Sequence, residues 1–354
     1  MAGVKSALCS AAAVVLGACA PYAASRLGFS GLPFAAPRDF LGGNLGWLSE
    51  FFAAANPLFA AVLLYGFSLA AFLVSGARGR TPTVAAQILA AAVAAHAAGA
   101  GVAAFLCGGM PPLDAPEIAV FMGIAAAVLG LLLYTKNRGA ECVASGASAG
   151  LLSLLVANAD GAVGSVAASF DSNLLFWTYY AAVVAGFGGS FLCGFAATFR
   201  IAANPLSRGN FGISTGDTAK TAYGLQCFSL FFLLAGTMLG GIWSDCVWGS
   251  FWSWDSREIG VFAVILWTAA ATHAKRFKLL SDRGYLGMAV LGNALCAWAV
   301  FGIGSAASHS VGEGRIGLYL WAFAGLEFAA WLLTFYKYAE KSWTGDKKKL
   351  ELKK

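Results

Sequence analysis

Residues 248 to 258 read Trp-Gly-Ser-Phe-Trp-Ser-Trp-Asp-Ser-Arg-Glu, and this stretch decides how the rest of the chain is interpreted. It holds three tryptophans and a phenylalanine within seven residues, and it closes with an aspartate, an arginine and a glutamate. It lies between two apolar segments, 223–244 and 259–275. Since aromatic side chains gather where a membrane meets water, we expect this run at a membrane surface.

The composition of the chain is that of a membrane protein. Of its 354 residues, 59% are hydrophobic and 11% are charged, whereas a soluble domain carries about 25% charged residues. A soluble chain of this length could not bury so much apolar surface. The 44 glycines suit helices that approach closely in lipid. We therefore predict an all-α, polytopic integral membrane protein.

About ten apolar segments have the length and composition of transmembrane helices. They lie at about 6–25, 57–75, 83–107, 117–134, 140–157, 174–199, 223–244, 259–275, 285–303 and 316–338. The first has a signal peptide as its alternative, because a lysine precedes a short apolar run. The segment 140–157 is the weakest, being short and rich in Ser and Gly. We expect residues 200–222 to form a cytoplasmic loop.

Basic residues recur after every second apolar segment, which predicts the orientation of the chain. Nearly every basic residue fits this pattern: Lys5, Arg78, Arg80, Lys136, Arg138, Arg200, Arg208, Lys220, Lys275, Arg276, Lys278 and Arg283, followed by the C-terminal tail. The loops 108–116 and 158–173 between them contain no Lys or Arg. Positively charged loops stay in the cytoplasm, so we expect both termini there and the tryptophan run outside. The net charge of +6 reports this orientation and predicts no nucleic-acid partner.

Packed indoles bordered by charges form a flat aromatic surface with polar anchors, which suits a large planar ligand that carries carboxylates. Heme is such a ligand. The residues expected to bind it are Trp248, Gly249, Trp252, Trp254, Asp255 and Arg257. On a helix, positions 248, 252 and 255 would share one face, and Gly249 would let a flat ligand approach the backbone. The guanidinium of Arg257 would pair with a heme propionate. The alternative, an interfacial aromatic belt, fits scattered tryptophans better.

The three histidines are candidate iron ligands. His309, in an expected outer loop, is either an ordinary interfacial histidine or an axial ligand to heme on the aromatic surface. His273 ends the segment 259–275 and is either a helix-end histidine stabilised by the helix dipole or a ligand to heme in transit. His96 lies inside an apolar segment, where an ionisable group marks a site or forms a hydrogen bond to a neighbouring helix.

Several chemistries are excluded by the motifs. The eight cysteines form no Cys-x-x-Cys and no Cys-x-x-Cys-His, so the chain is neither a c-type cytochrome nor a thiol oxidoreductase by its own motifs. It has no phosphate-binding Walker sequence and no nucleotide fingerprint. We assign no catalytic residue.

The tryptophan run resembles the tryptophan-rich (WWD) signature of a superfamily of heme-handling membrane proteins that includes CcsA (ResC), CcmC and CcmF. CcsA is the most similar type, with the pattern Trp-Gly-x-Tyr-Trp-x-Trp-Asp-Pro-x-Glu. Three further stretches agree: Thr-His273-Ala-Lys-Arg, Ser-His309-Ser, and Gly-Met-Pro-Pro-Leu-Asp-Ala-Pro-Glu at 109–117. The resemblance covers roughly residues 85 to 335.

The resemblance implies a heme-handling subunit of system II cytochrome c maturation in a bacterial inner membrane. With a CcsB (ResB)-like membrane partner, it would move heme b outward and present it to an apocytochrome c bearing Cys-x-x-Cys-His. His309 then matches an outer axial ligand and His273 the ligand of an inner transit site. Whether this chain takes part in a holocytochrome c synthase reaction stays open.

The corresponding division of the chain has three parts. Residues 1–82 form an N-terminal helix pair with a long outer loop, residues 83–340 a heme-handling membrane domain, and residues 341–354 a basic cytoplasmic tail.

The chain departs from the family pattern at three positions. The first outer histidine of the family is missing, and its position falls at Thr178 or Tyr179; Met110 replaces another histidine and Ser256 the usual proline. A phenolate ligates ferric heme, so Tyr179 is a candidate ligand, with five-coordinate iron as the alternative. Two other functions stay open: a divergent membrane transporter of heme or another amphipathic molecule, and a CcmC-like or CcmF-like subunit.

Overall fold

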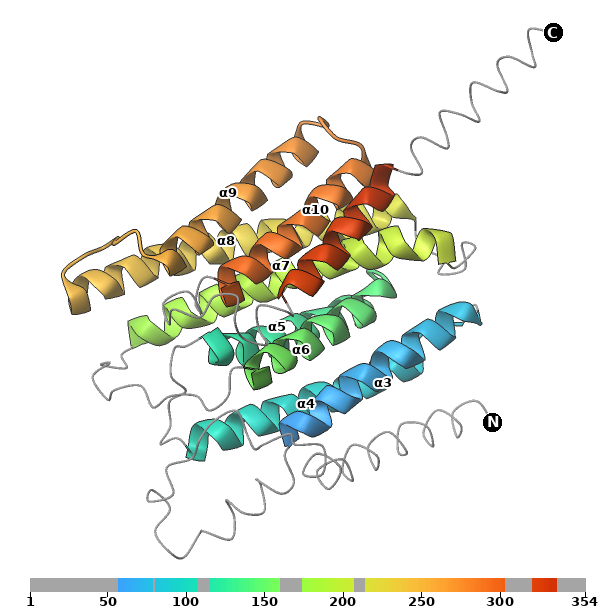
Figure 1. The fold of residues 1–354 in the computed structure, drawn as a ribbon, viewed down its shortest axis with the longest axis horizontal. Helices are drawn as coiled ribbons and strands as arrows, with labels where there is room; N and C mark the ends of the chain where they lie inside the picture. The colour runs from blue at the N-terminus through green and yellow to red at the C-terminus, as the bar shows by residue number, and fades with distance from the viewer. Residues whose placement is uncertain are drawn as a thin grey trace, which may run out of the picture.

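A computed structural model describes residues 57–78, 80–106, 115–159, 174–206, 214–302 and 320–335. In these ranges every regular element is a helix, as the composition predicts (Figure 1). The helices are α3 (Pro57–Ala77), α4 (Thr83–Leu106), α5 (Ala115–Thr135), α6 (Glu141–Ala159), α7 (Leu174–Leu206), α8 (Thr215–Trp248), α9 (Ser256–Arg276), α10 (Asp282–Ala297) and the π-helix η1 (Trp298–Gly302). A further helix, Leu320–Phe335, follows.

Each predicted apolar segment from residue 57 onward coincides with a helix, and the segment 6–25 lies outside the described residues. Among the described helices, six are long and apolar enough to cross a membrane: α3, α4, α5, α7, α8, and α10 together with η1. The helix α6 and the helix Leu320–Phe335 are apolar but shorter. The total of about ten transmembrane helices and the cytoplasmic position of both termini stay predictions.

The predicted cytoplasmic loop at 200–222 is too long at both ends. Helix α7 continues to Leu206 and α8 begins at Thr215. The start of α8 is stabilised by Ser214, whose side chain accepts a hydrogen bond from the backbone N–H of Asp217. Asp217 also places a negative charge in the first turn, where the helix dipole favours it. Hydropathy ends a segment where polar residues begin, whereas a capped helix continues through them.

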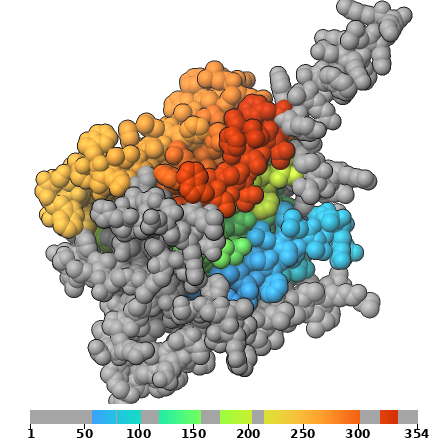
Figure 2. All heavy atoms as spheres, in the orientation of Figure 1, coloured from blue at the N-terminus to red at the C-terminus, as the bar shows by residue number. Residues whose placement is uncertain are grey.

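The helices form two apolar clusters that lie side by side. One cluster is built by α3, α4, α5 and α6, and the other by α5, α6, α7, α8, α9, α10, η1 and the helix Leu320–Phe335. The closest pairs are α3 with α4, α5 with α6, and α7 with α8, each pair consecutive in the chain (Figure 1). In Figure 2, the helix Leu320–Phe335 lies on the surface beside the orange segments of α9 and α10. The division of the chain at residue 82 stays a prediction.

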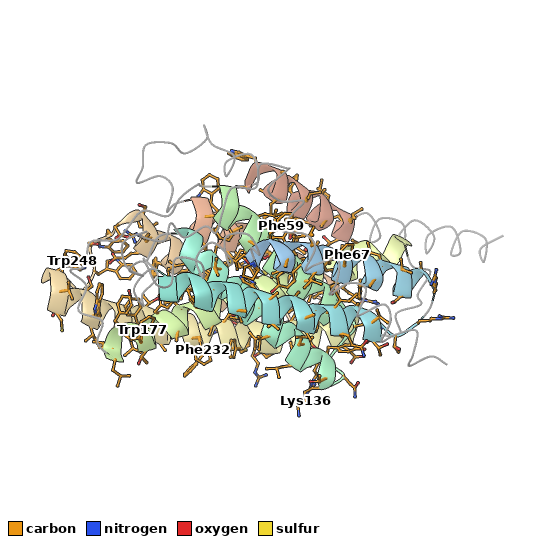
Figure 3. All side chains as sticks on the ribbon, turned by 90° about the horizontal axis from the view of Figure 1, so that it is seen from below. Phe59, Phe67, Lys136, Trp177, Phe232 and Trp248 are labelled. Atoms are coloured by element: carbon orange, nitrogen blue, oxygen red, sulfur yellow. The ribbon has the colours of Figure 1, made fainter. Side chains whose placement is uncertain are left out.

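The two ends of the bundle differ in chemistry. The turns after α3, α5 and α9 carry basic residues, whereas the tryptophan run joins the other ends of α8 and α9. Figure 3 shows Lys136 at one end, and Trp177 and Trp248 at the opposite end. This separation is what the alternation of basic loops predicts, although it does not assign either end to a side of the membrane.

Glycines allow α7 and α8 to approach closely. A Cβ on Gly186 would lie 2.9 Å from the backbone nitrogen of Leu233, and one on Gly236 would lie 3.0 Å from the backbone nitrogen of Val183. These contacts are too short for any side chain, so both glycines are required at the interface.

We expect Gly236→Ala to destabilise the protein by about 1–3 kcal/mol, because the new methyl group meets backbone that cannot move aside. Gly224→Ala is the matched control on the same helix, since a Cβ there meets nothing within 4 Å. Thermal unfolding in detergent measures the difference. Equal midpoints for the two variants would contradict this packing.

Candidate functional site

The tryptophan run forms a loop between two capped helices. Helix α8 ends at Trp248, where the cap residue Gly249 has φ +70° and donates its backbone N–H to the carbonyl of Asp245. Helix α9 begins after the cap residue Asp255, whose carboxylate accepts from the N–H of Glu258 at 2.8 Å. The expectation that positions 248, 252 and 255 share one helical face is therefore wrong. A left-handed glycine ends one helix and an aspartate starts the next.

The loop is closed by a second set of hydrogen bonds. The carboxylate of Glu258 accepts from the backbone N–H of Ser253 at 2.8 Å, and the hydroxyl of Ser250 donates to the carbonyl of Trp252 at 3.2 Å. These bonds enclose Trp254, which has φ +58°, a conformation that residues other than glycine rarely adopt. Such strain persists only where the surroundings hold it, so the loop has one defined shape.

This loop presents two large indoles at the surface. Trp248 is 63% exposed and Trp254 is 64% exposed. The ring of Trp252 meets Trp254 edge to face, with centroids 5.7 Å apart at 85°, and both rings pack against Phe262 of α9. Trp252 and Phe262 thus fix the orientation of the Trp254 ring through perpendicular ring contacts. We name the surface formed by Trp248, Trp252, Trp254 and Phe262 the aromatic surface.

Tyr179 of α7 lies at the same end of the bundle. Its ring packs on Trp243 of α8 at 5.6 Å and on Phe176 at 5.3 Å, above the bare backbone of Gly240. Arg257 opens α9 just after the tryptophan run, so Tyr179 and Arg257 lie at the same end of the bundle on helices that are distant in sequence.

Arg257 is available to a ligand. Among the residues that the structure describes, it forms no salt bridge with a carboxylate. The two acidic neighbours that sequence reasoning placed at the rim are engaged within the loop, Asp255 as the cap of α9 and Glu258 as an acceptor for Ser253. Arg257 is therefore the remaining charged anchor of the run.

His273 lies at the other end of α9, far from the aromatic surface. Its Nδ1 is 2.7 Å from the carbonyl oxygen of Ala269, and the imidazole is exposed and stacked on Phe277. A carbonyl only accepts, so Nδ1 carries a proton, and in the neutral imidazole Nε2 keeps its free electron pair. This arrangement is typical of histidines that bind metals through Nε2.

Of the other two histidines, the structure describes His96 and not His309. His96 is fully buried on α4, with Nδ1 3.0 Å from the Tyr65 hydroxyl of α3, so it is bonded to a neighbouring helix as one of its two interpretations expects. Its ring also lies against Gly123 of α5. His309 lies outside the described residues, as does Met110, and their roles stay predictions.

Two features escaped sequence reasoning. Phe262, which supports the aromatic surface, follows the run by one helical turn and looks like an ordinary apolar residue. Glu327, a buried acid within the apolar segment 316–338, carries a clearer signal, because an ionisable residue inside a membrane segment is itself unusual.

The described helices and the aromatic surface define an all-helical membrane protein with a rigid aromatic loop at one end. Within that class, comparison with known proteins confirms the predicted resemblance to CcsA-type cytochrome c biogenesis proteins. A CcsA protein of Trieres chinensis is 45% identical over 42 residues, 12% of this chain and 13% of that protein. One of Synechococcus sp. (strain JA-3-3Ab) is 34% identical over 99 residues, 23% of this chain and 28% of that protein.

The coverage of these matches is partial. A third CcsA protein, of Helianthus annuus, is 29% identical over 82 residues, and the match spans 26% of its length. No protein-family model matches the chain. Among solved structures, a cytochrome c heme lyase CcmF shares the fold with a TM-score of 0.55 and 18% identity, over 79% of this chain and 55% of that one.

We expect Asp255→Ala to destabilise the protein by about 1 kcal/mol, because it removes the side chain that caps α9. Asp255→Asn retains a side-chain oxygen at the cap and is the control, with stability close to that of the wild type. Thermal unfolding in detergent distinguishes the two. If Asp255→Asn is as unstable as Asp255→Ala, the carboxylate charge matters for another reason.

Proposed function

We propose that the protein handles heme in cytochrome c maturation and presents it on the aromatic surface. The observation that carries this proposal is the exposure of Trp248 and Trp254 on a hydrogen-bonded loop of one defined shape, next to an arginine free of carboxylate partners. Large exposed indoles are costly in water unless they meet lipid or a ligand. The similarity to CcsA proteins supports the same role.

The aromatic surface matches the chemistry of heme in two respects. Indole faces contact the apolar macrocycle, and the guanidinium of Arg257 pairs with a propionate. Trp254 offers an exposed indole to a ligand while its ring meets Trp252 and Phe262 at right angles. Gly249 and Asp255, also predicted to contact heme, support the site through their caps, and contact with the ligand remains part of the proposal.

Tyr179 is the candidate that stands in for the missing outer histidine. Of the two residues at that position, Thr178 is exposed and its hydroxyl donates to the carbonyl of Leu174 within its own helix. Tyr179 instead packs on Trp243, at the end of the bundle that holds Arg257. A phenolate is a known ligand of ferric heme, and coordination to the iron would displace the phenol proton. His309 is the proposed ligand on the opposite face of heme.

His273 is the proposed ligand of an inner transit site. Its exposed ring has a free Nε2 when neutral, and the basic end of the bundle places Arg276 near it, whose guanidinium suits a propionate, whereas Lys275 pairs with Asp282. In this proposal heme b enters at that end and leaves at the aromatic surface, which faces the outside of a bacterial inner membrane. A CcsB-like partner and an apocytochrome c bearing Cys-x-x-Cys-His complete the system II assembly.

We expect Trp254→Ala to lower the heme that copurifies with the protein by about tenfold or more, because loss of an aromatic contact on a large ligand costs 1.4 kcal/mol or more. Trp321→Ala is the matched control, since Trp321 is 65% exposed against 64% for Trp254 but lies outside the aromatic surface. Heme content per chain, measured after expression with the partner in heme-replete cells, gives the comparison. Equal losses in both variants would contradict a specific role of the loop.

We expect Tyr179→Phe to change the absorption spectrum of bound ferric heme while leaving the fold intact, because phenylalanine keeps the packing on Trp243 and removes only the oxygen. His309→Ala should change the same bands. An unchanged spectrum in Tyr179→Phe discards the tyrosinate, and the absence of heme from the wild-type complex favours a transporter of another amphipathic molecule.

A further inference from the structure

A polar cluster lies inside the bundle, away from the aromatic surface. It joins Glu327 of the helix Leu320–Phe335 to Thr198 of α7 and Asn293 of α10. The hydroxyl of Thr198 is 2.6 Å from Oε2 of Glu327, and Nδ2 of Asn293 is 2.7 Å from Oε1. Glu327 is 1% exposed and Asn293 is fully buried, so both carboxyl oxygens are removed from solvent.

Within the part of the chain that the structure describes, Glu327 forms no salt bridge, and its carboxyl contacts the side chains of Thr198 and Asn293. The arginines on the same helices are directed elsewhere: Arg283 donates to the carbonyl of Leu333, and the charge of Arg200 acts on Glu141. The other buried titratable groups on α7 and α10 are Tyr180, Cys193, Tyr285 and Cys296, and neither a phenol nor a thiol can carry a positive charge. A buried carboxylate without a cation is strongly disfavoured, whereas a carboxylic acid is not.

The hydrogen bonds available to the Thr198 hydroxyl also indicate that Glu327 is protonated. Its hydroxyl has one proton and two acceptors within reach, Oε2 of Glu327 at 2.6 Å and the carbonyl of Gly194 at 3.1 Å. If Glu327 were ionised, the two acceptors would compete for that proton. If Glu327 is protonated, it donates to Oγ1 of Thr198, Thr198 donates to Gly194, and Asn293 donates to Oε1, so each close contact is a hydrogen bond.

We propose that Glu327 is a resident proton site within the membrane, a carboxylic acid whose hydrogen bonds hold the helix Leu320–Phe335 against α7 and α10. Gly194 makes room for this contact, because a Cβ there would lie 2.2 Å from the Cβ of Asn293. The site is distinct from the heme ligands and uses neither the aromatic surface nor His273.

The position of the cluster gives it a role at the heme site, and this part rests on the proposed function. Helix α10 with η1 ends at Gly302, and the next described helix begins at Leu320. Glu327 ties both of these helices to α7, the helix that carries Tyr179. Glu327 is therefore a positioning residue for the described helices that precede and follow the segment of His309.

The direct test is infrared difference spectroscopy of the purified protein at neutral pH, wild type minus Glu327→Gln. The wild type should show the C=O stretch of a protonated carboxylic acid that the variant lacks. Thr198→Val removes the acceptor of the acid proton and should shift this band to higher frequency. The absence of the band, or a carboxylate band in its place, overturns the proton site whether or not heme is bound.

Stability and heme spectra test the positioning role. Glutamine reproduces the hydrogen bonds of the acid, with Nε2 donating to Thr198 and Oε1 accepting from Asn293, so Glu327→Gln should keep the wild-type unfolding midpoint and the heme spectrum. Glu327→Leu has no such bonds and should lose both. If Glu327→Gln loses as much of the unfolding midpoint and of the heme spectrum as Glu327→Leu, Glu327 is not a neutral acid in the wild type. If the wild type binds no heme while the infrared band is present, the proposed function fails and the proton site stands.

Discussion

The turn between α8 and α9 is the constraint on which the functional end of this molecule depends. Gly249 ends one helix in a left-handed conformation, and Asp255 begins the next by accepting from its first turn. Between them, Glu258 holds the backbone at Ser253. The two caps therefore end one helix and begin the next, and the run between them forms a loop that exposes its indoles.

The two ends of the bundle carry different parts of the proposed heme path. One end holds the aromatic surface, Arg257 and Tyr179, and the other holds His273 with its free Nε2. Helix α9 joins them, since it begins at the loop and ends just beyond His273. A single helix thus fixes the separation between the proposed inner and outer sites, whereas the ligands that complete each site come from other segments or a partner.

The sequence predicts more of the fold than of the candidate site. Apolar length predicts the helices because each span must bury or present a continuous apolar surface to lipid. The helical form assigned to the run fails because periodicity does not detect caps, although Gly249 and the spacing of Asp255 and Glu258 are recognisable cap signals. The packing of Tyr179 on Trp243 has no local signal, since tertiary packing alone brings these residues together. Glu327 stands out in the sequence, but its partners do not.

The central claim is that heme lies on the aromatic surface, and the position of a covalent heme adduct tests it most directly. A cysteine introduced as Ser253→Cys, with the exposed Cys246 replaced by serine, would add its S–H across a vinyl group of heme bound beside Trp254. Heme staining of the denatured chain detects the thioether. The account predicts an adduct for Ser253→Cys and none for Leu132→Cys, an exposed position near the basic end. Bound heme with no adduct at position 253, or equal adducts at both positions, would contradict it.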